Sequence, residues 1–221
     1  MGEKVLTLVS GGIDSPVASV LASQRFDVIP LHYSVYPMSS RENAIQSFQI
    51  LRILKEKIGF EKAIVYPWVV ILSEIKEKLD DRYGCVACRR IMLRIASEIC
   101  RREECQGIVT GESLGQKASQ TLKNIRATSR GTSFPVIRPL IGLNKNEIVK
   151  LSRKFNLRTE DHAGCCKAVP ESPSTMTNWE ELDIKMGKIQ LEEVYKPIYI
   201  TEIKDFEKKD SYYLSKVNSK L

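Results

Sequence analysis

The chain has 221 residues, of which 43% are hydrophobic and 28% are charged, and its formal net charge at pH 7 is +7. This length is sufficient for one large α/β domain with its own core. No apolar run approaches the roughly 18 residues of a membrane span, and the N-terminus lacks a basic, then apolar leader, so we expect a cytoplasmic protein without membrane contact. The positive charge is compatible with a polyanionic partner such as RNA, but also with solubility alone.

The first predicted element is a strand at residues 5–9, which ends in the glycine-containing turn at residues 10–16. A helical pattern follows, and we expect Ser15 to be its N-cap and Pro16 to lie in its first turn. A strand that ends in such a turn leaves several backbone N–H groups pointing one way, next to the positive end of the helix dipole. The sequence therefore predicts a phosphate site here.

The turn carries its own acid, Asp14, and it lacks the lysine and the length of the GxxxxGK[ST] phosphate loop. A carboxylate beside bound phosphates would repel them unless a divalent cation lies between, so Asp14 predicts Mg²⁺ shared with phosphate oxygens. The alternative interpretation is an ordinary turn from strand to helix. The position at the end of the first strand, with serines on both sides and an acid inside, favours the phosphate site.

Strand and helix patterns alternate along the rest of the chain. We expect strands at 27–36, 62–69, 107–111 and 135–141, and helices at 41–58, 72–79, 88–102, 117–127 and 145–155. Asn144 followed by Glu147 is typical of a capping box. The alternation predicts an α/β fold with a mostly parallel sheet and helices on both faces. Ligands of such sheets lie beyond the carboxyl ends of the strands, where the glycine turn also lies.

Two further strand ends carry residues suited to a nucleotide. The segment 110–121 is rich in glycine and small polar residues, which lets backbone approach a ligand closely. Lys145 stands in the first turn of a predicted helix, where a cation is unfavourable with the dipole. It is either solvated or faces an anion, and its place after a strand end favours the anion.

Four motifs occur in an order that resembles one family. The turn at 10–16 resembles the pyrophosphate (PP) loop of the adenine-nucleotide α-hydrolase superfamily, and segments 88–96, 110–122 and 138–148 resemble the catalytic domain of the ThiI family. These are tRNA 4-thiouridine sulfurtransferases that are also linked to thiamine thiazole synthesis. The resemblance implies a PP-loop ATP pyrophosphatase fold and a reaction in which ATP adenylates a tRNA uridine, U8, pyrophosphate leaves, and sulfur displaces AMP.

The resemblance also implies roles for single residues. It implies ATP contacts for Leu8, Val9, Ser10, Gly11, Gly12, Asp14, Ser15, His32, Tyr33, Arg89, Gly111 and Gln120. It implies that Asp14 and Lys145 catalyse adenylation, which agrees with the need of a leaving pyrophosphate for Mg²⁺ and a cation. His32 and Tyr33 are expected to contribute backbone contacts, and a core role for their side chains stays open.

Six cysteines favour metal or redox chemistry over structural disulfides in such a chain. The resemblance places a catalytic cysteine at Cys165 or Cys166, and we favour Cys166. The CxxC of Cys85 and Cys88 resembles archaeal-type members that hold an iron–sulfur cluster with three cysteines. We therefore expect a [4Fe-4S] cluster on Cys85, Cys88 and Cys166, with Cys165 as the alternative third ligand. A redox dithiol, half of a zinc site and an unligated pair are the other interpretations of the CxxC.

The expected catalytic domain spans residues 1–178, and an extension of unassigned role spans 179–221 and either packs on the core or mediates a homodimer. Relatives carry a THUMP region before this domain, so we expect tRNA to be bound by a separate THUMP-type protein or by a basic surface. The sulfur donor is expected to be a protein or sulfide. Cys100 and Cys105 are expected to be structural. The candidate basic contacts are Arg89, Arg90, Arg94, Lys117, Lys123, Arg126 and Arg130.

Two other functions remain open from the sequence. One is a PP-loop enzyme that adenylates a small amide or carboxyl and passes in ammonia or sulfide, which would keep Asp14 and Lys145 but not need the cysteines. The other is a nucleotide- or RNA-binding module without catalysis. The combination of the acid, the lysine and the cysteines favours the enzyme.

Overall fold

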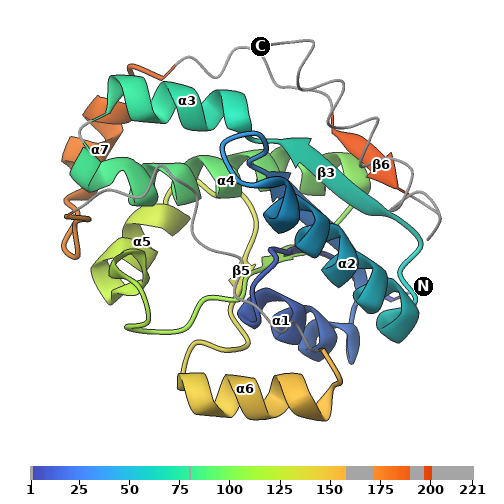
Figure 1. Ribbon diagram of the computed structural model, residues 1–221. Coiled ribbons are helices and arrows are strands. Elements are labelled where there is room, and N and C mark those ends of the chain that lie inside the picture. The colour runs from blue at the N-terminus through green and yellow to red at the C-terminus, as the bar shows by residue number, and fades with distance from the viewer. Residues whose placement is uncertain (1, 80, 158–171, 190–196, 201–221) are drawn as a thin grey trace.

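The computed structural model describes residues 2–79, 81–157, 172–189 and 197–200, and in this part of the chain one sheet is flanked by helices (Figure 1). The strands are β1 (Lys4–Leu8), β2 (Asp27–Ser34), β3 (Ala63–Pro67), β4 (Gly107–Val109), β5 (Val136–Ile137) and β6 (Ile198–Ile200). Their order is β5-β4-β1-β2-β3-β6, and every pair is parallel except β3 with β6. The predicted mostly parallel α/β sheet is confirmed.

Helices cover both faces of this sheet. They are α1 (Asp14–Ser23), α2 (Arg41–Ile58), α3 (Val69–Lys78), α4 (Asp81–Glu103), the 3₁₀ turn η1 (Ala118–Gln120), α5 (Leu122–Ser129), α6 (Lys145–Lys154) and α7 (Trp179–Met186). Figure 1 shows α1, α2 and α6 on one side and α3, α4 and α7 on the other. Strand β1 serves both cores, because Leu6 packs into the α3–α4 cluster and Val5 into the α1–α2 cluster, as the alternation of strand side chains requires.

Local sequence signals predicted the bounds of α2 and the start of α6 correctly. The predicted helix 41–58 is confirmed, since the Ser40 Oγ accepts from the Asn43 N–H at its start and Gly59 ends it with a φ of 67°. The capping box at α6 is also confirmed: the Asn144 side chain accepts from the Glu147 N–H at 3.1 Å, and the Glu147 carboxylate accepts from the Asn144 N–H at 2.7 Å. Both ends satisfy backbone groups that the helix itself leaves unpaired.

Several predicted boundaries were wrong. The helix expected to begin at residue 88 begins at Asp81, so both cysteines of the CxxC lie within α4. The helix expected at 72–79 begins at Val69 and packs in the core, where it buries Ile71, Leu72 and Ile75. The helix expected at 117–127 is divided at Thr121, whose extended backbone caps α5.

The fifth strand is shorter than expected, at two residues in place of 135–141. Pro139 has no N–H to donate to a ladder, and the chain turns there, with the Ile141 N–H donating to the Arg138 carbonyl at 3.2 Å. In the part of the chain that the structure places, no helix combines the length and the apolar composition that crossing a bilayer requires. The domain boundary at residue 178 stays a prediction.

Candidate functional site

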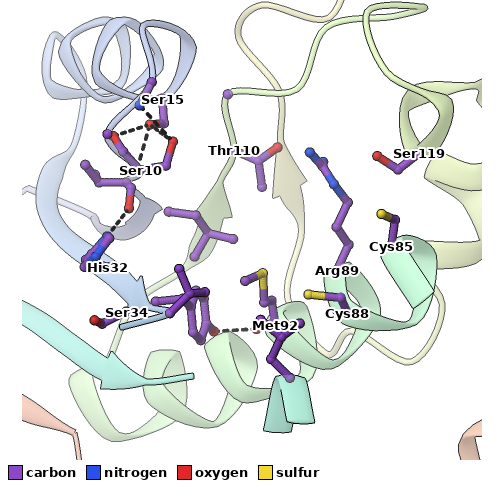
Figure 2. Close-up of a pocket in the computed structure, with 18 of the residues that line it drawn as sticks. Ser10, Ser15, His32, Ser34, Cys85, Cys88, Arg89, Met92, Thr110 and Ser119 are labelled. Carbon is purple, nitrogen blue, oxygen red and sulfur yellow. Dashed lines mark hydrogen bonds between the residues drawn. The ribbon is translucent and has the colours of Figure 1, made fainter. Parts of the chain in front are cut away.

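A cavity of about 420 Å³ lies at the carboxyl ends of β1, β2 and β4. We call it the strand-end cavity. Its walls come from the PP loop, the end of β2, the first half of α4 and the segment from Thr110 to Gln120 (Figure 2). Every residue for which the family resemblance implies an ATP contact lines it. The fold therefore gathers into one hollow residues that are spread over more than a hundred positions of the sequence.

The PP loop is closed on itself by two serines. The Ser10 N–H donates to the Ser15 Oγ at 2.8 Å, and the Ser15 hydroxyl donates to the Ser10 carbonyl at 3.3 Å. The expectation that Ser15 is the N-cap was wrong, because α1 begins at Asp14 with Ile13 as its N-cap. Ser15 instead holds the loop, and the apolar Ile13 side chain makes no cap hydrogen bond. The N-cap side chain therefore satisfies none of the backbone N–H groups at the start of α1, an arrangement that suits an anion.

Gly111 allows β4 to approach this loop closely. A Cβ atom added there would lie 2.6 Å from the Ser15 nitrogen and 2.8 Å from the Asp14 carbonyl carbon. No side chain fits at these distances, so the end of β4 packs directly against the first turn of α1. The glycine-rich segment thus shapes the wall of the strand-end cavity, and its expected close approach to a nucleotide stays a prediction.

Asp14 and Lys145 meet beside the cavity. The Lys145 Nζ donates to the Asp14 Oδ1 at 2.6 Å, and the two side chains are 25% and 42% exposed. Lys145 is the first residue of α6 and faces the Asp14 carboxylate, while its expected contact with nucleotide phosphates stays a prediction. A carboxylate in the phosphate loop is a suitable Mg²⁺ ligand, and the ammonium beside it is suited to phosphate oxygens.

The side chains of His32 and Tyr33 form hydrogen bonds with backbone carbonyls of the protein. The His32 Nδ1 lies 2.9 Å from the Val9 carbonyl, to which it donates, and burial lowers the pKa of His32. The Tyr33 hydroxyl donates to the Met92 carbonyl at 2.5 Å, and its ring packs edge-on to Trp68. Both are core side chains, so the interpretation that these positions offer backbone to a nucleotide agrees with the geometry and stays a prediction.

Gln120 offers an acceptor in the cavity wall. Its side chain is 4% exposed, and its Oε1 has no hydrogen-bond partner among the described residues. An unpaired buried amide oxygen is costly, which favours a ligand donor at this point. Arg89, which also lines the cavity, is ion-paired with Glu112, and Glu112 in turn binds Arg138. Glu112 was not among the predicted site residues, although its place one residue after Gly111, at the end of a strand, was a signal.

Cys85 and Cys88 lie one turn apart on α4, and both are half-buried and line the cavity. Figure 2 shows them on the same helix as Arg89. Cys165 and Cys166 lie outside the described residues, so the third ligand of the expected cluster stays a prediction. Within the ranges that the structure places, no three His, Cys, Asp or Glu residues form a group that could hold a metal ion.

Cys100 and Cys105 are not among the residues that line the cavity, and they lie at the end of α4 and just beyond it. Both are buried, and the Cys100 Sγ lies 3.5 Å from the Gly107 carbonyl. A hydrogen bond between the two thiols raises the pKa of Cys100 and lowers that of Cys105. Their burial in the core agrees with the expected structural role.

Comparison with known proteins decides the family. The sequence profile of the family described as thiamine biosynthesis protein (ThiI) matches residues 1–191. The chain belongs to the ThiI family. It is 36% identical over 196 residues to a probable tRNA sulfurtransferase of Methanocaldococcus jannaschii, covering 85% of this chain and 50% of the relative. A probable tRNA sulfurtransferase of Acetivibrio thermocellus is 34% identical over 209 residues, covering 90% and 53%. The chain therefore spans about half the length of these ThiI relatives.

Solved structures agree with the fold. The crystal structure of a 4-thiouridine synthetase–RNA complex with bound ATP is similar with a TM-score of 0.78 and 27% identity, covering 96% of this chain and 53% of that one. The U34-tRNA thiolase NcsA from Methanococcus maripaludis with its [4Fe-4S] cluster is similar with a TM-score of 0.52, at 16% identity, covering 97% and 73%. At that identity the second likeness concerns the fold alone.

The basic residues of this ThiI chain divide into buried and exposed ones. Arg90 is 2% exposed and ion-paired with Asp183 of α7, so its expected role as a surface contact for RNA was wrong. Its guanidinium instead ties α4 to α7, where Arg130 also stacks on Trp179 at 3.4 Å. The exposed candidates lie around η1 and α5, and they are Lys117, Lys123, Arg126 and Arg130.

Proposed function

We propose that this chain carries the catalytic site of an ATP-dependent tRNA sulfurtransferase, which adenylates a tRNA uridine, U8, and replaces its oxygen with sulfur to give 4-thiouridine. The observation that carries this proposal is the contact of Lys145 with Asp14 in the PP loop, next to a cavity that also contains Cys85 and Cys88. Phosphate chemistry and sulfur chemistry then share one hollow. Membership of the ThiI family supports the same reaction and its proposed link to thiamine synthesis.

Adenylation would use the PP loop. Backbone N–H groups at the start of α1 would bind the ATP phosphates, and Asp14 would hold Mg²⁺ against them. The uridine O4 would attack the α-phosphorus while the bond to pyrophosphate breaks. Lys145 would stabilise the charge that develops on the leaving pyrophosphate. In the second step sulfide, free or released by a donor protein, would attack C4 of the base, and the C4–O bond would break as AMP leaves.

The nucleotide itself would lie along the cavity wall. Leu8, Val9, His32 and Tyr33 would offer backbone groups from the ends of β1 and β2. Gly111 would allow close approach of the nucleotide to β4, and Gln120 would accept a hydrogen bond through its unpaired Oε1. Arg89 would contribute a cation at the cavity side of α4. Each of these contacts is a proposal that rests on position in the cavity wall.

The CxxC would hold an iron–sulfur cluster. Cys85 and Cys88 fit such a group, because two thiols three positions apart on a helix share one side and here both reach the cavity. Cys166, or Cys165 in its place, would be the third ligand. When bound by three cysteines, a [4Fe-4S] cluster has one open iron that can carry an extra sulfide. The U34-tRNA thiolase of Methanococcus maripaludis, which is similar in fold, has a [4Fe-4S] cluster.

For tRNA, the proposed contacts are the exposed lysines and arginines around η1 and α5, alone or together with a THUMP-type RNA-binding protein. A homodimer is a further proposal for the residues from 179 onward. The salt dependence of tRNA binding, measured for this chain alone, would distinguish direct binding from delivery by a partner.

The test separates the two chemical steps. Wild type, Asp14→Ala and Cys88→Ser are purified without oxygen and given ATP, Mg²⁺, sulfide and tRNA, while pyrophosphate release and 4-thiouridine are measured. We expect Asp14→Ala to lose pyrophosphate release and Cys88→Ser to keep it but form no 4-thiouridine. Cys100→Ala, which removes a thiol outside the cavity, is the matched control and should retain both.

Other results would overturn this assignment. If both variants fail at the same step, the proposed division of roles is wrong. Pyrophosphate release with small amides or carboxylates but not with tRNA would favour the small-molecule enzyme. Binding of ATP or RNA without any release would favour a non-catalytic module. Iron and acid-labile sulfide, with about four irons per chain in wild type and loss in Cys85→Ser and Cys88→Ser, would test the cluster separately.

A further inference from the structure

Glu112 is a buried carboxylate that three donors share at the wall of the strand-end cavity. Its side chain is 5% exposed. Arg89 of α4 is ion-paired with its Oε1, while its Oε2 accepts from the Arg138 Nε at 2.7 Å and from the Thr110 hydroxyl at 3.1 Å. Glu112 therefore links the end of β4 to α4 and to the residue that follows β5.

The carboxylate is charged in this setting. Burial alone would raise the pKa of Glu112, but the charges of Arg89 and Arg138 and the hydrogen bonds from Arg138 and Thr110 outweigh it and hold the pKa below its ordinary value. One carboxylate and two guanidinium groups leave a net charge of +1. The cluster thus retains one positive charge at the edge of a cavity that suits an anion.

The two arginines differ in what else they bind. The other guanidinium nitrogens of Arg138 donate to the Ser129 hydroxyl at 2.6 Å and to the Val136 carbonyl at 3.3 Å, and its side chain is 13% exposed. All three guanidinium nitrogens of Arg138 therefore donate hydrogen bonds to groups within the protein. The Arg89 side chain is 28% exposed and lines the cavity. Figure 2 shows it extending from α4 toward the space between Thr110 and Ser119.

We infer that Glu112 is a positioning residue for nucleotide phosphates: it holds the Arg89 guanidinium at the cavity wall, and Arg138 offsets the charge of the carboxylate so that Arg89 keeps its own for the ligand. This inference rests on the proposed function, because it takes the anion to be ATP. A long arginine side chain loses rotamer freedom when it is fixed for a ligand, and a charged partner that fixes it beforehand reduces that cost on binding.

The inference predicts a loss confined to phosphate recognition. Glu112→Gln keeps the shape of the side chain but removes the charge that holds Arg89. We expect the Kd for Mg²⁺–ATP to rise about tenfold, the scale of one charge-assisted hydrogen bond, and the Kd for adenosine, which has no phosphate, to stay unchanged. Calorimetric titration of the full chain with each ligand measures both.

The matched control is Glu103→Gln. Glu103 is 8% exposed and ion-paired with Lys62 at the other end of α4, away from the cavity. We expect Glu103→Gln to lower the Tm about as much as Glu112→Gln does, but to leave the Kd values for ATP and adenosine unchanged. If Glu112→Gln does not fold, Glu112→Asp is used, because it keeps the charge on a side chain one methylene shorter. We expect this variant to raise the Kd for ATP severalfold and to leave the Kd for adenosine unchanged.

Each other outcome is decisive. An unchanged Kd for ATP in the Glu112 variants, with ATP bound by wild type, would overturn the inference and leave the proposed function standing. An equal rise in the Kd values for ATP and adenosine would show that Glu112 only maintains the fold, and this result would also overturn the inference. Wild-type protein that binds no ATP would overturn the proposed function itself.

Discussion

Lys145 and Asp14 are separated by 131 positions in the sequence, yet their side chains meet at 2.6 Å. The contact arises because α6 packs on α1, where Ile148 and Val17 belong to one buried cluster. Both charged side chains remain partly exposed, so water screens their attraction. A surface ion pair of this kind contributes about 0–1 kcal/mol to stability, so we expect the fold to depend little on it.

Replacing either member of this pair should affect chemistry far more than folding. We expect Asp14→Asn and Lys145→Met each to reduce ATP-dependent pyrophosphate release by at least about 100-fold, the scale of lost charge stabilisation in a transition state. The Tm should change by no more than about 2 °C. Glu74→Gln, which breaks the comparable exposed pair with Lys78, should leave release unchanged. A large fall in Tm in step with activity would contradict this prediction.

Gly111→Ala should damage the PP loop from outside it. The new Cβ would lie 2.6 Å from the Ser15 nitrogen, so β4 or the first turn of α1 must shift. We expect the free energy of unfolding to fall by about 1–3 kcal/mol and the Kd for ATP to rise at least about tenfold. The control is Gly142→Ala, whose Cβ meets no atom within 4 Å. Denaturant unfolding and ATP titration check both, and equal behaviour of the two variants would refute the prediction.

His32 should make stability depend on pH. Burial holds its pKa below the ordinary value of 6.5, so the unfolded chain takes up a proton at a higher pH than the folded protein does. The contribution of neutral His32 is therefore complete above about pH 6.5 and decreases as the pH falls toward the lowered folded pKa, with a slope of up to about 1.4 kcal/mol per pH unit.

The comparison variant is His32→Asn, which keeps a donor near the position of Nδ1 but cannot titrate. Urea unfolding of both proteins between pH 7.5 and about pH 5.5 should give a shallower decrease for the variant. Parallel curves would mean that His32 has the same pKa in both states. His162 and the carboxylates are common to the two proteins and cancel in the difference.

Asn124 should be a strong anchor for residues 174–177. Its side chain is fully buried, donating to the Ala118 and Ser174 carbonyls at 2.7 Å each and accepting from the Thr177 N–H at 2.9 Å. Asn124→Ala leaves these groups unpaired and should lower the free energy of unfolding by on the order of 2–4 kcal/mol. The exposed neighbour Lys123→Ala should cost less than about 0.5 kcal/mol in the same unfolding experiment. Similar costs for both would contradict the anchor.

Much of the fold was accessible from local sequence. The period of apolar residues predicted the helix 41–58, Asn144 and Glu147 predicted the start of α6, and the alternation of elements predicted a parallel sheet. These features depend on sterics and hydrogen bonds between residues a few positions apart. The glycine turn at 10–16 likewise predicted a loop at a strand end, because its backbone requirements are local.

What the sequence could not determine were partners distant along the chain. The burial of Arg90 goes with its ion pair to Asp183 of α7, which no local pattern encodes. Glu112 looks like an ordinary loop acid until the strand order places β4 between β1 and β5 and brings Arg89 and Arg138 to it. Local patterns were therefore enough to place the charged and thiol groups near strand ends. Which of these charges meet depends on the order of the strands and on the packing of helices far apart in the sequence, because those contacts join residues that no local pattern connects.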